Sequence, residues 1–180
     1  MNYKNITSKN DEHIEQIIRV NQAGEFGAKR IYEGQLVVLK NDKKYKIIKR
    51  MADQEEEHLK TFNKMMVEKG VRPTILSPLW NIGGFVLGAT TALISTEAAM
   101  ACTVAVEEVI DKHYEAQRLL LKKKKREKKL LKTIEKFRLE ELEHKNIALK
   151  NDAEKTKNYR SLTKGIKVIA SMAIFLSKKI

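Results

Sequence analysis

Four glutamates and two histidines occur at spacings that suit the binding of a pair of metal ions. They are Glu25, Glu55, His58, Glu107, Glu141 and His144. Both histidines follow a glutamate by three residues, and positions i and i+3 of a helix project from nearly the same side. The interval from Glu25 to Glu55 resembles the interval from Glu107 to Glu141. The chain therefore contains two similar halves, and each supplies one glutamate and one Glu-x-x-His motif.

Each of these glutamates lies in the middle of a stripe of apolar residues with helical spacing. An ionised carboxylate among apolar residues is costly unless a cation pairs with it, so four such carboxylates need a common explanation. Two divalent cations would balance four carboxylates and two neutral imidazoles. Carboxylate and imidazole ligands suit iron or manganese, and the absence of thiolates argues against structural zinc. The alternative, ion pairs on exposed helix surfaces, is disfavoured because apolar residues flank each position.

The elements that position these residues are predicted to be helices, because apolar residues recur at steps of three or four. Long helices are expected over Asp11–Lys40, Lys43–Lys69, Glu97–Leu121 and Glu127–Lys150. Gly70 is expected to end the second of them. A last amphipathic helix is expected over residues 159–178.

Residues 71–96 are expected to form an irregular and apolar crossover between the two pairs of long helices. The stretch holds both prolines, Pro73 and Pro78, and the only tryptophan, Trp80. Its uncharged part, residues 82–96, is shorter than a spanning helix needs to be. We therefore expect a buried or membrane-dipping connection and no transmembrane helix.

Four long helices with a long crossover after the second have the topology of ferritin-like bundles. We predict an all-α fold, namely a ferritin-like four-helix bundle with extra apolar and amphipathic helices. The 180 residues suit a single domain, in which the polar residues 1–12 are an N-terminal extension. One glutamate and one Glu-x-x-His motif from each half is the ligand set of di-iron and di-manganese sites in such bundles.

The remaining charged and reactive residues give weaker indications. The formal net charge of +13 favours a membrane surface or a nucleic acid as partner, or it reflects a general lysine-rich bias. The basic run at residues 121–129 has no aromatic residue to support base stacking. His13 is expected to be solvated, whereas His113 is either a partner of a metal ligand or a partly exposed helix residue. Cys102 is the only cysteine, which excludes an intrachain disulfide.

Five segments resemble the demethoxyubiquinone hydroxylase family of ferritin-like di-iron carboxylate proteins. They read RVNQAGEFGAKRIYEGQ (19–35), MADQEEEHLKTFN (51–63), RPTILSPLWNIGGFVLG (72–88), AMACTVAVEEVIDKHY (99–114) and FRLEELEHKNIAL (137–149). Ferritins and rubrerythrins share the ligand spacing but not the PLWN and ACTVAVEE stretches. One departure is Leu139, where the family usually has an acidic residue. If that acidic group orients a ligand histidine, the surroundings of the histidine differ in this chain.

The resemblance implies an O2-dependent di-iron monooxygenase that hydroxylates the ring of demethoxyubiquinone or demethoxyubiquinol in a late step of ubiquinone synthesis. It also implies that the six residues named first are the iron ligands, with Glu55 and Glu141 or Glu107 as candidates to bridge the ions. No catalytic residue is expected beyond the ligands. His113 and Tyr114 match a pair that lies near the metal in the family.

The implied cofactors are two iron ions, with O2 as co-substrate and an external electron donor, for which NADH is a candidate. The implied partners are a polyprenylated quinone, a membrane surface and a ubiquinone-synthesis complex with a lipid-presenting accessory protein. A homo-oligomer is compatible with the sequence, and a nucleic-acid partner is not expected. We expect a peripheral membrane protein on the cytoplasmic face of the cell membrane, or on the matrix face of the inner membrane in a mitochondrion.

An apolar path for the prenyl chain is expected along residues 80–92 and the C-terminal helix, and a charge at Phe85 or Leu87 is expected to abolish membrane association.

Three other functions fit parts of the pattern. They are a di-iron hydroxylase acting on tRNA, an iron store or peroxidase of the ferritin-like class, and a metal-free helical module that binds membranes.

Overall fold

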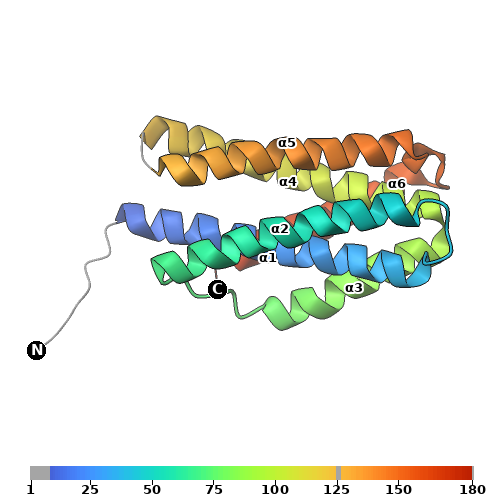
Figure 1. The fold of residues 1–180 in the computed structure, drawn as a ribbon, viewed down its shortest axis with the longest axis horizontal. Coiled ribbons are helices and arrows are strands. Elements are labelled where there is room, and N and C mark those ends of the chain that lie inside the picture. Colours follow the sequence, from blue (N-terminus) through green and yellow to red (C-terminus); the bar gives the residue numbers. More distant parts are fainter. Residues whose placement is uncertain (1–8, 125–126, 180) are drawn as a thin grey trace, which may run out of the picture.

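The computed structural model describes residues 9–124 and 127–179, in which the secondary structure is helical and no strand occurs (Figure 1). In chain order the elements are α1 (Lys9–Val38), α2 (Tyr45–Lys69), α3 (Ser77–Ile94), α4 (Thr96–Lys124), α5 (Lys128–Lys150), the short 3₁₀ helix η1 (Ala153–Lys155) and α6 (Tyr159–Ser177). The predicted ferritin-like four-helix bundle with extra helices is confirmed. Part of the basic run, residues 125–126, lies outside the described residues.

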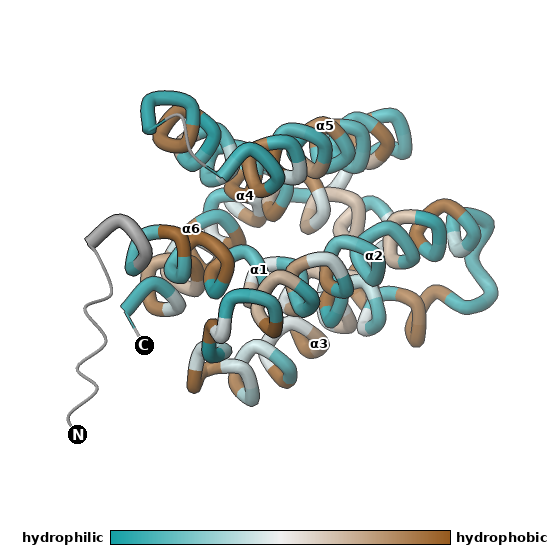
Figure 2. Tube along the Cα trace, turned by 60° about the vertical axis from the view of Figure 1, so that its left-hand side comes forward, coloured by the Kyte–Doolittle hydropathy of each residue, from teal (hydrophilic) through white to brown (hydrophobic). Residues whose placement is uncertain are grey.

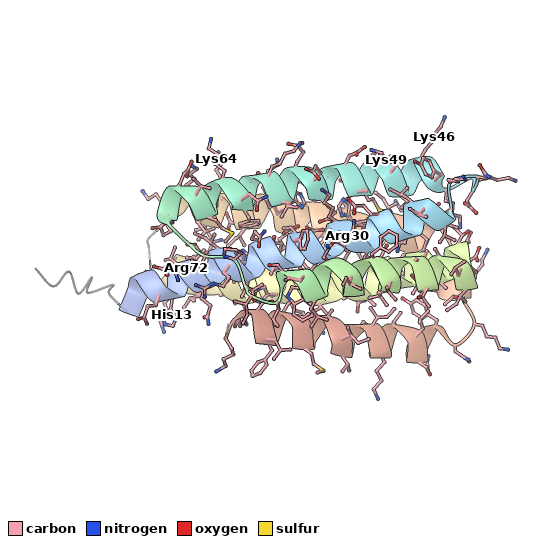
Figure 3. The ribbon with its side chains drawn as sticks, turned by 90° about the horizontal axis from the view of Figure 1, so that it is seen from below. His13, Arg30, Lys46, Lys49, Lys64 and Arg72 are labelled. Atoms are coloured by element: carbon pink, nitrogen blue, oxygen red, sulfur yellow. The ribbon has the colours of Figure 1, made fainter. Side chains whose placement is uncertain are left out.

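Two helical hairpins form the bundle, α1 with α2 and α4 with α5. Helix α3 packs along α1, and α6 packs along α4. In the view of Figure 3, α3 and α6 lie next to each other on one side of the bundle, away from α2. The indole Nε1 of Trp80 on α3 donates a hydrogen bond to Ser177 Oγ on α6 at 3.0 Å, which ties the two extra helices together.

Two local features explain the turns that align the bundle helices. Gly70 adopts φ +64°, a left-handed conformation that glycine takes without steric cost, and it ends α2 as predicted. Between α1 and α2, Asp42 accepts hydrogen bonds from the backbone N–H of Lys44 and from Thr96 Oγ1, both at 2.7 Å. These bonds lower the pKa of Asp42 and tie the first turn to the start of α4.

The expectation of an irregular crossover is wrong from Ser77 onward, because residues 77–94 form the regular helix α3, which is one of the extra apolar helices that the predicted fold includes. Pro78 lies in the first helical turn, where a missing backbone N–H costs nothing. Two glycines of the stretch serve close packing, because an added Cβ at Gly84 or Gly88 would collide with the backbone of α1. In the described part of the chain, α3 is the one helix that could cross a membrane by length and composition, a test that core helices also pass.

The apolar core is divided by a buried polar layer in the middle of the bundle. One cluster includes Ile18, Phe62 and Ile134 toward one end, and the other includes Met51 and Met100 toward the opposite end. Between them, each bundle helix contributes a glutamate that is almost completely buried. Apolar packing on both sides therefore holds the carboxylates in place and excludes water from them.

Candidate metal centre

The six residues selected from their spacing meet in this polar layer. Each side chain is at most 2% exposed, although all six are ionisable. Helix α1 supplies Glu25, α4 supplies Glu107, and the two Glu-x-x-His motifs come from α2 and α5. Residues more than a hundred positions apart in sequence thus share one small volume, as the pseudo-repeat predicted.

The donor atoms form two overlapping groups, and the members of each group lie within 4.8 Å of one another. The first contains Glu25, Glu55, His58 and Glu141, and the second contains Glu55, Glu107, Glu141 and His144. Glu55 and Glu141 belong to both groups, so each carboxylate would be within reach of both ions of a bound pair. Glu107, the other candidate bridge, belongs to one group only.

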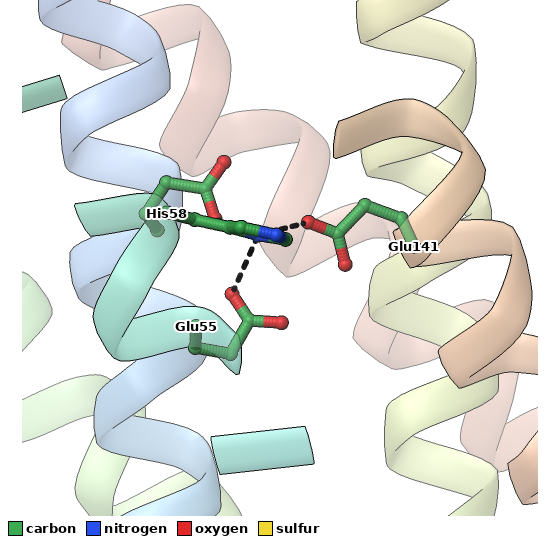
Figure 4. A group of neighbouring side chains, drawn as sticks. Glu55, His58 and Glu141 are labelled. Carbon is green, nitrogen blue, oxygen red and sulfur yellow. Dashed lines mark hydrogen bonds and ion pairs between the residues drawn. The ribbon is translucent and has the colours of Figure 1, made fainter. Parts of the chain in front are cut away.

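The histidine rings turn their Nδ1 atoms toward the carboxylates. His58 Nδ1 lies 3.0 Å from Glu141 Oε1 and 3.9 Å from Glu55 Oε2, and Figure 4 shows the two carboxylates approaching it from α5 and α2. His144 Nδ1 lies 3.1 Å from an oxygen of Glu55 and 3.1 Å from an oxygen of Glu141. The two rings are 6.4 Å apart and inclined by 23°, so they flank the carboxylates from similar directions.

The donor set fits a pair of divalent cations. Among the described residues, buried carboxylate oxygens of all four glutamates lack any hydrogen-bond donor, and so does Nδ1 of His144. Such groups are rare in folded proteins, because a buried acceptor without a partner costs about 1–3 kcal/mol. Four carboxylates and two imidazoles facing one point can all be satisfied by metal ions, and this combination of oxygen and nitrogen ligands suits iron or manganese.

Without a cation, protons have to compensate the crowded charge. Burial raises the pKa of Glu55 well above its ordinary value, and the charge of Glu141 adds to this effect. Burial lowers the pKa of His58, but its contacts with Glu141 and Glu25 outweigh this and raise it above its ordinary value. The cluster therefore retains protons that bound metal ions would displace.

Two buried tyrosines hold the single glutamates. The hydroxyl of Tyr32 donates to Glu107 Oε1 at 3.0 Å, and the hydroxyl of Tyr114 donates to Glu25. The contact of Tyr114 agrees with its selection from the sequence. The role of Tyr32 was missed, because its position in the apolar stripe of α1 is also that of an ordinary core residue.

His113, the other selected neighbour, does not touch a candidate ligand. Its Nε2 accepts a hydrogen bond from Gln117 Nε2 at 2.7 Å, and Gln117 is in turn bonded to Asn21 on α1. Burial and the charge of Lys178 lower the pKa of His113 to about 4. His113 is therefore neutral at pH 7 and belongs to a polar chain that runs beside the cluster.

The outer nitrogens of the two candidate ligand histidines also have partners. His58 Nε2 contacts Glu140 Oε2 at 2.9 Å, and His144 Nε2 contacts Gln54 Oε1 at 3.1 Å. Leu139 is 65% exposed, and the carboxylate that contacts the outer nitrogen of His58 comes from the next residue, Glu140. In the sequence, Glu140 lies among other glutamates, and helix periodicity alone does not decide which of these neighbouring residues faces the centre.

An apolar pocket of about 490 Å³ lies beside the centre, between α1, α3, α4 and α6. Its walls include Gly24 and Val106, the sequence neighbours of Glu25 and Glu107. Trp80 and Leu87 of α3 and Ile174 of α6 also line the pocket, which therefore lies between the two helices along which an apolar path is expected.

Comparison with known proteins gives a consistent picture. Residues 12–177 match the family described as ubiquinone biosynthesis protein COQ7. The chain is 54% identical to the NADPH-dependent 3-demethoxyubiquinone 3-hydroxylase, mitochondrial, of Dictyostelium discoideum, over 93% of this chain and 77% of that protein. It is 46% identical to the 3-demethoxyubiquinol 3-hydroxylase of Rhodospirillum rubrum, over 93% and 78%. It is 42% identical to the 5-demethoxyubiquinone hydroxylase, mitochondrial, of Saccharomyces cerevisiae, over 98% and 82%.

Proposed function

Because this chain belongs to the family of the ubiquinone biosynthesis protein COQ7, we propose that it is a di-iron monooxygenase that hydroxylates the ring of a demethoxyubiquinone. The observation that carries the proposal is the buried cluster of four glutamates and two histidines whose free acceptors face one another. The relatives are named as hydroxylases of ubiquinone synthesis, so the tRNA and iron-storage alternatives are not favoured.

In the proposed reaction, one atom of O2 replaces a ring hydrogen as a hydroxyl group. The other atom leaves as water, with two electrons and one proton from the nicotinamide nucleotide and a second proton from the solvent. Iron, when bound, supplies the redox steps and the O2 activation that side chains cannot perform. Several relatives are named NADPH-dependent, which supports a nicotinamide nucleotide as the electron donor.

The residues of this chain would bind, orient and shield. The carboxylates of Glu55 and Glu141 would each contact both ions, and the hydroxyls of Tyr32 and Tyr114 would hold the outer carboxylates in place. The apolar pocket would take the quinone and the first part of its prenyl chain. Apolar packing on both sides of the cluster would keep water out, so that the reduction of O2 is coupled to hydroxylation of the ring.

A hydroxylation assay under ¹⁸O2 tests the proposal. It combines ferrous-loaded protein, NADPH or NADH, and a short-chain demethoxyquinone, and the product is analysed by mass spectrometry. We expect one labelled oxygen per product molecule, lost in Glu141→Ala and retained in Glu143→Ala, which alters an exposed glutamate on the same helix. Protein that holds two irons but forms no labelled product would contradict the proposed substrate.

We also propose that the face formed by α3 and α6 binds the surface of the membrane that contains the quinone. Support comes from exposed apolar side chains, among them Ile82 and Val86 on α3 and Met172 and Phe175 on α6, all more than 50% exposed. Figure 2 shows hydrophobic residues along α6. In Figure 3 the labelled Lys46, Lys49 and Lys64 point outward from α2, at the opposite edge of the molecule.

Flotation with vesicles of phosphatidylcholine and phosphatidylglycerol tests this surface. Phe85 stacks with Arg30, and Leu87 packs against the core, so neither is the best position for an added charge. We expect the double variant Ile82→Glu with Val86→Glu to lose vesicle binding. The control Val67→Glu, at an 84% exposed position on α2, should float as the wild type does. Equal flotation of all three proteins would exclude α3 as the docking surface.

A further inference from the structure

The two candidate ligand histidines are supported by chemically different groups. His58 Nε2 donates to the carboxylate of Glu140, and His144 Nε2 donates to the amide oxygen of Gln54. Each partner directly precedes the glutamate of the Glu-x-x-His motif on the opposite helix. Equivalent positions in the two halves of the chain therefore hold a negative charge in one half and a neutral dipole in the other.

Both partners fix the same ring orientation. A carboxylate and an amide oxygen only accept hydrogen bonds, so the proton on the outer nitrogen Nε2 stays on each ring. The inner nitrogen Nδ1 is then the atom that can bind an ion, and in both residues it faces the shared carboxylates. Glu140 and Gln54 thus orient the histidine rings of the two halves in the same way.

The two partners differ in how strongly they polarise the ring. A carboxylate hydrogen-bonded to a ligand imidazole makes it a better electron donor to a metal, and loss of such a partner typically costs 10–100-fold in metal affinity. Glu140 is 25% exposed at its side chain, and its other oxygen lies 3.6 Å from the ammonium of Lys136. Lys136 is itself 68% exposed, so solvent screens its charge and the carboxylate still polarises the buried ring of His58.

The rest of the two environments is similar. Each ring is at most 2% exposed and has an aromatic neighbour, Phe137 stacked on His58 and Tyr32 edge-on to His144. Each also contacts both shared glutamates through Nδ1. His58 Nδ1 also lies 3.4 Å from Oε2 of Glu25, the single glutamate of its group. Outside the six candidate ligands, the charge on the outer nitrogen's partner is the chemical difference between the halves.

We propose that Glu140 and Gln54 are positioning residues that make the two metal positions unequal, so that the position at Glu25 and His58 fills before the position at Glu107 and His144. The inference rests on the proposed function, because it presupposes a centre for two ions. It adds that the order of filling is set outside the ligands, by one charged and one neutral side chain.

Titration of the metal-free protein with Zn²⁺, followed by NMR of ¹⁵N-labelled histidine, tests the order of filling. The chain has four histidines, and the signals of the two ligands can be assigned from His58→Ala and His144→Ala. We expect the first equivalent to shift Nδ1 of His58 and the second to shift Nδ1 of His144. Stepwise binding alone would not be decisive, because a first cation always weakens the binding of a second one nearby.

The decisive variant exchanges the two partners, Glu140→Gln together with Gln54→Glu. We expect the exchange to reverse the order of the shifts, whereas Glu140→Gln alone should weaken the first binding step about 10–100-fold. Glu143→Gln, an exposed change on the same helix, should preserve the wild-type order. A purely structural role of Glu140 could weaken binding at His58, but it could not strengthen binding at His144, as the added carboxylate of Gln54→Glu is expected to do.

Three outcomes would overturn the inference. Simultaneous shifts of both histidines in the wild type, or an unchanged order in the exchanged variant, would show that the partners do not set the filling order, and the proposed function would stand. Absence of any Zn²⁺-dependent shift at either histidine would overturn the inference and the proposed metal centre together.

Discussion

At the scale of single residues, the centre consists of acceptors that face inward and of donors that hold them from outside. The hydroxyls of Tyr32 and Tyr114 each donate to one oxygen of Glu107 and of Glu25, and the second oxygen of each of these two carboxylates has no hydrogen-bond donor. The rings of His58 and His144 are oriented by acceptors instead, because the outer nitrogen of each ring donates to Glu140 or Gln54. A bound ion therefore meets ligands that need little reorganisation.

His113 gives a pH-dependent prediction at this scale. Its pKa is lowered from 6.5 to about 4 by burial and by Lys178, so the folded state resists protonation more than the unfolded state does. Stability should therefore fall as the pH drops from about 6.5 to 4. We expect His113→Gln to remove about 2 kcal/mol of the loss between pH 7 and pH 4.5, measured by urea unfolding at both values. His13→Gln, at an exposed histidine, is the matched control, and equal pH dependence in all three proteins would refute this account of His113.

The six candidate ligands could be selected from the sequence because their constraint is local. A glutamate and a histidine three residues apart must share a helix face, and an apolar stripe marks that face as buried. Their partners could not be selected in the same way. Glu140 and Gln54 lie one position from the motif glutamates, and only the packing of α2 against α5 decides whether such a residue reaches a histidine or the solvent.

At the scale of elements, glycine contacts decide how α3 lies on α1. A Cβ at Gly88 would collide with the backbone of Ile31, and a Cβ at Gly34 would collide with the backbone of Phe85. The sequence predicted an apolar segment here, but it did not reveal the regular helix beginning at Ser77. Prolines and glycines usually mark loops, whereas here one proline starts a helix and two glycines allow close approach.

Alanine substitutions at two neighbouring glycines test this packing. Gly88→Ala should lower the free energy of unfolding by about 2–3 kcal/mol, because rigid backbone atoms have to move apart. Gly83→Ala meets nothing within 4 Å and should be neutral or stabilise the helix by up to about 1 kcal/mol. Both values can be measured by urea denaturation. Equal effects of the two substitutions would mean that the close contact between α1 and α3 does not exist in solution.

At the scale of the whole molecule, the two extra helices add an apolar pocket to the bundle that contains the candidate metal centre. The pocket is walled by both extra helices and by α1 and α4, and its lining includes residues adjacent to two candidate ligands. Under the proposed function, this pocket is where the quinone and the first part of its prenyl chain would bind. The sequence located the two apolar segments, but it could not show that they meet to enclose a pocket.

A glycine in the pocket wall allows the entrance to be blocked without disturbing the bundle. A Cβ at Gly27 on α1 meets nothing within 4 Å, so Gly27→Leu should fill the pocket and raise the KM for a demethoxyquinone about tenfold or more. Iron content should not change. The control Gly165→Leu, at an exposed and equally open glycine on α6, should keep the wild-type KM in detergent. A wild-type KM in Gly27→Leu would place the substrate elsewhere.

The central claim is that one chain holds two iron ions in its buried layer of four glutamates and two histidines. Its most direct test is an anaerobic titration of the metal-free protein with ferrous iron, followed by ⁵⁷Fe Mössbauer spectroscopy. The account predicts saturation at two ions per chain in the wild type and in Glu57→Ala, whose glutamate is exposed, and at fewer than two in Glu55→Ala. Saturation at one ion or none in the folded wild type, or at two ions in Glu55→Ala, would contradict it.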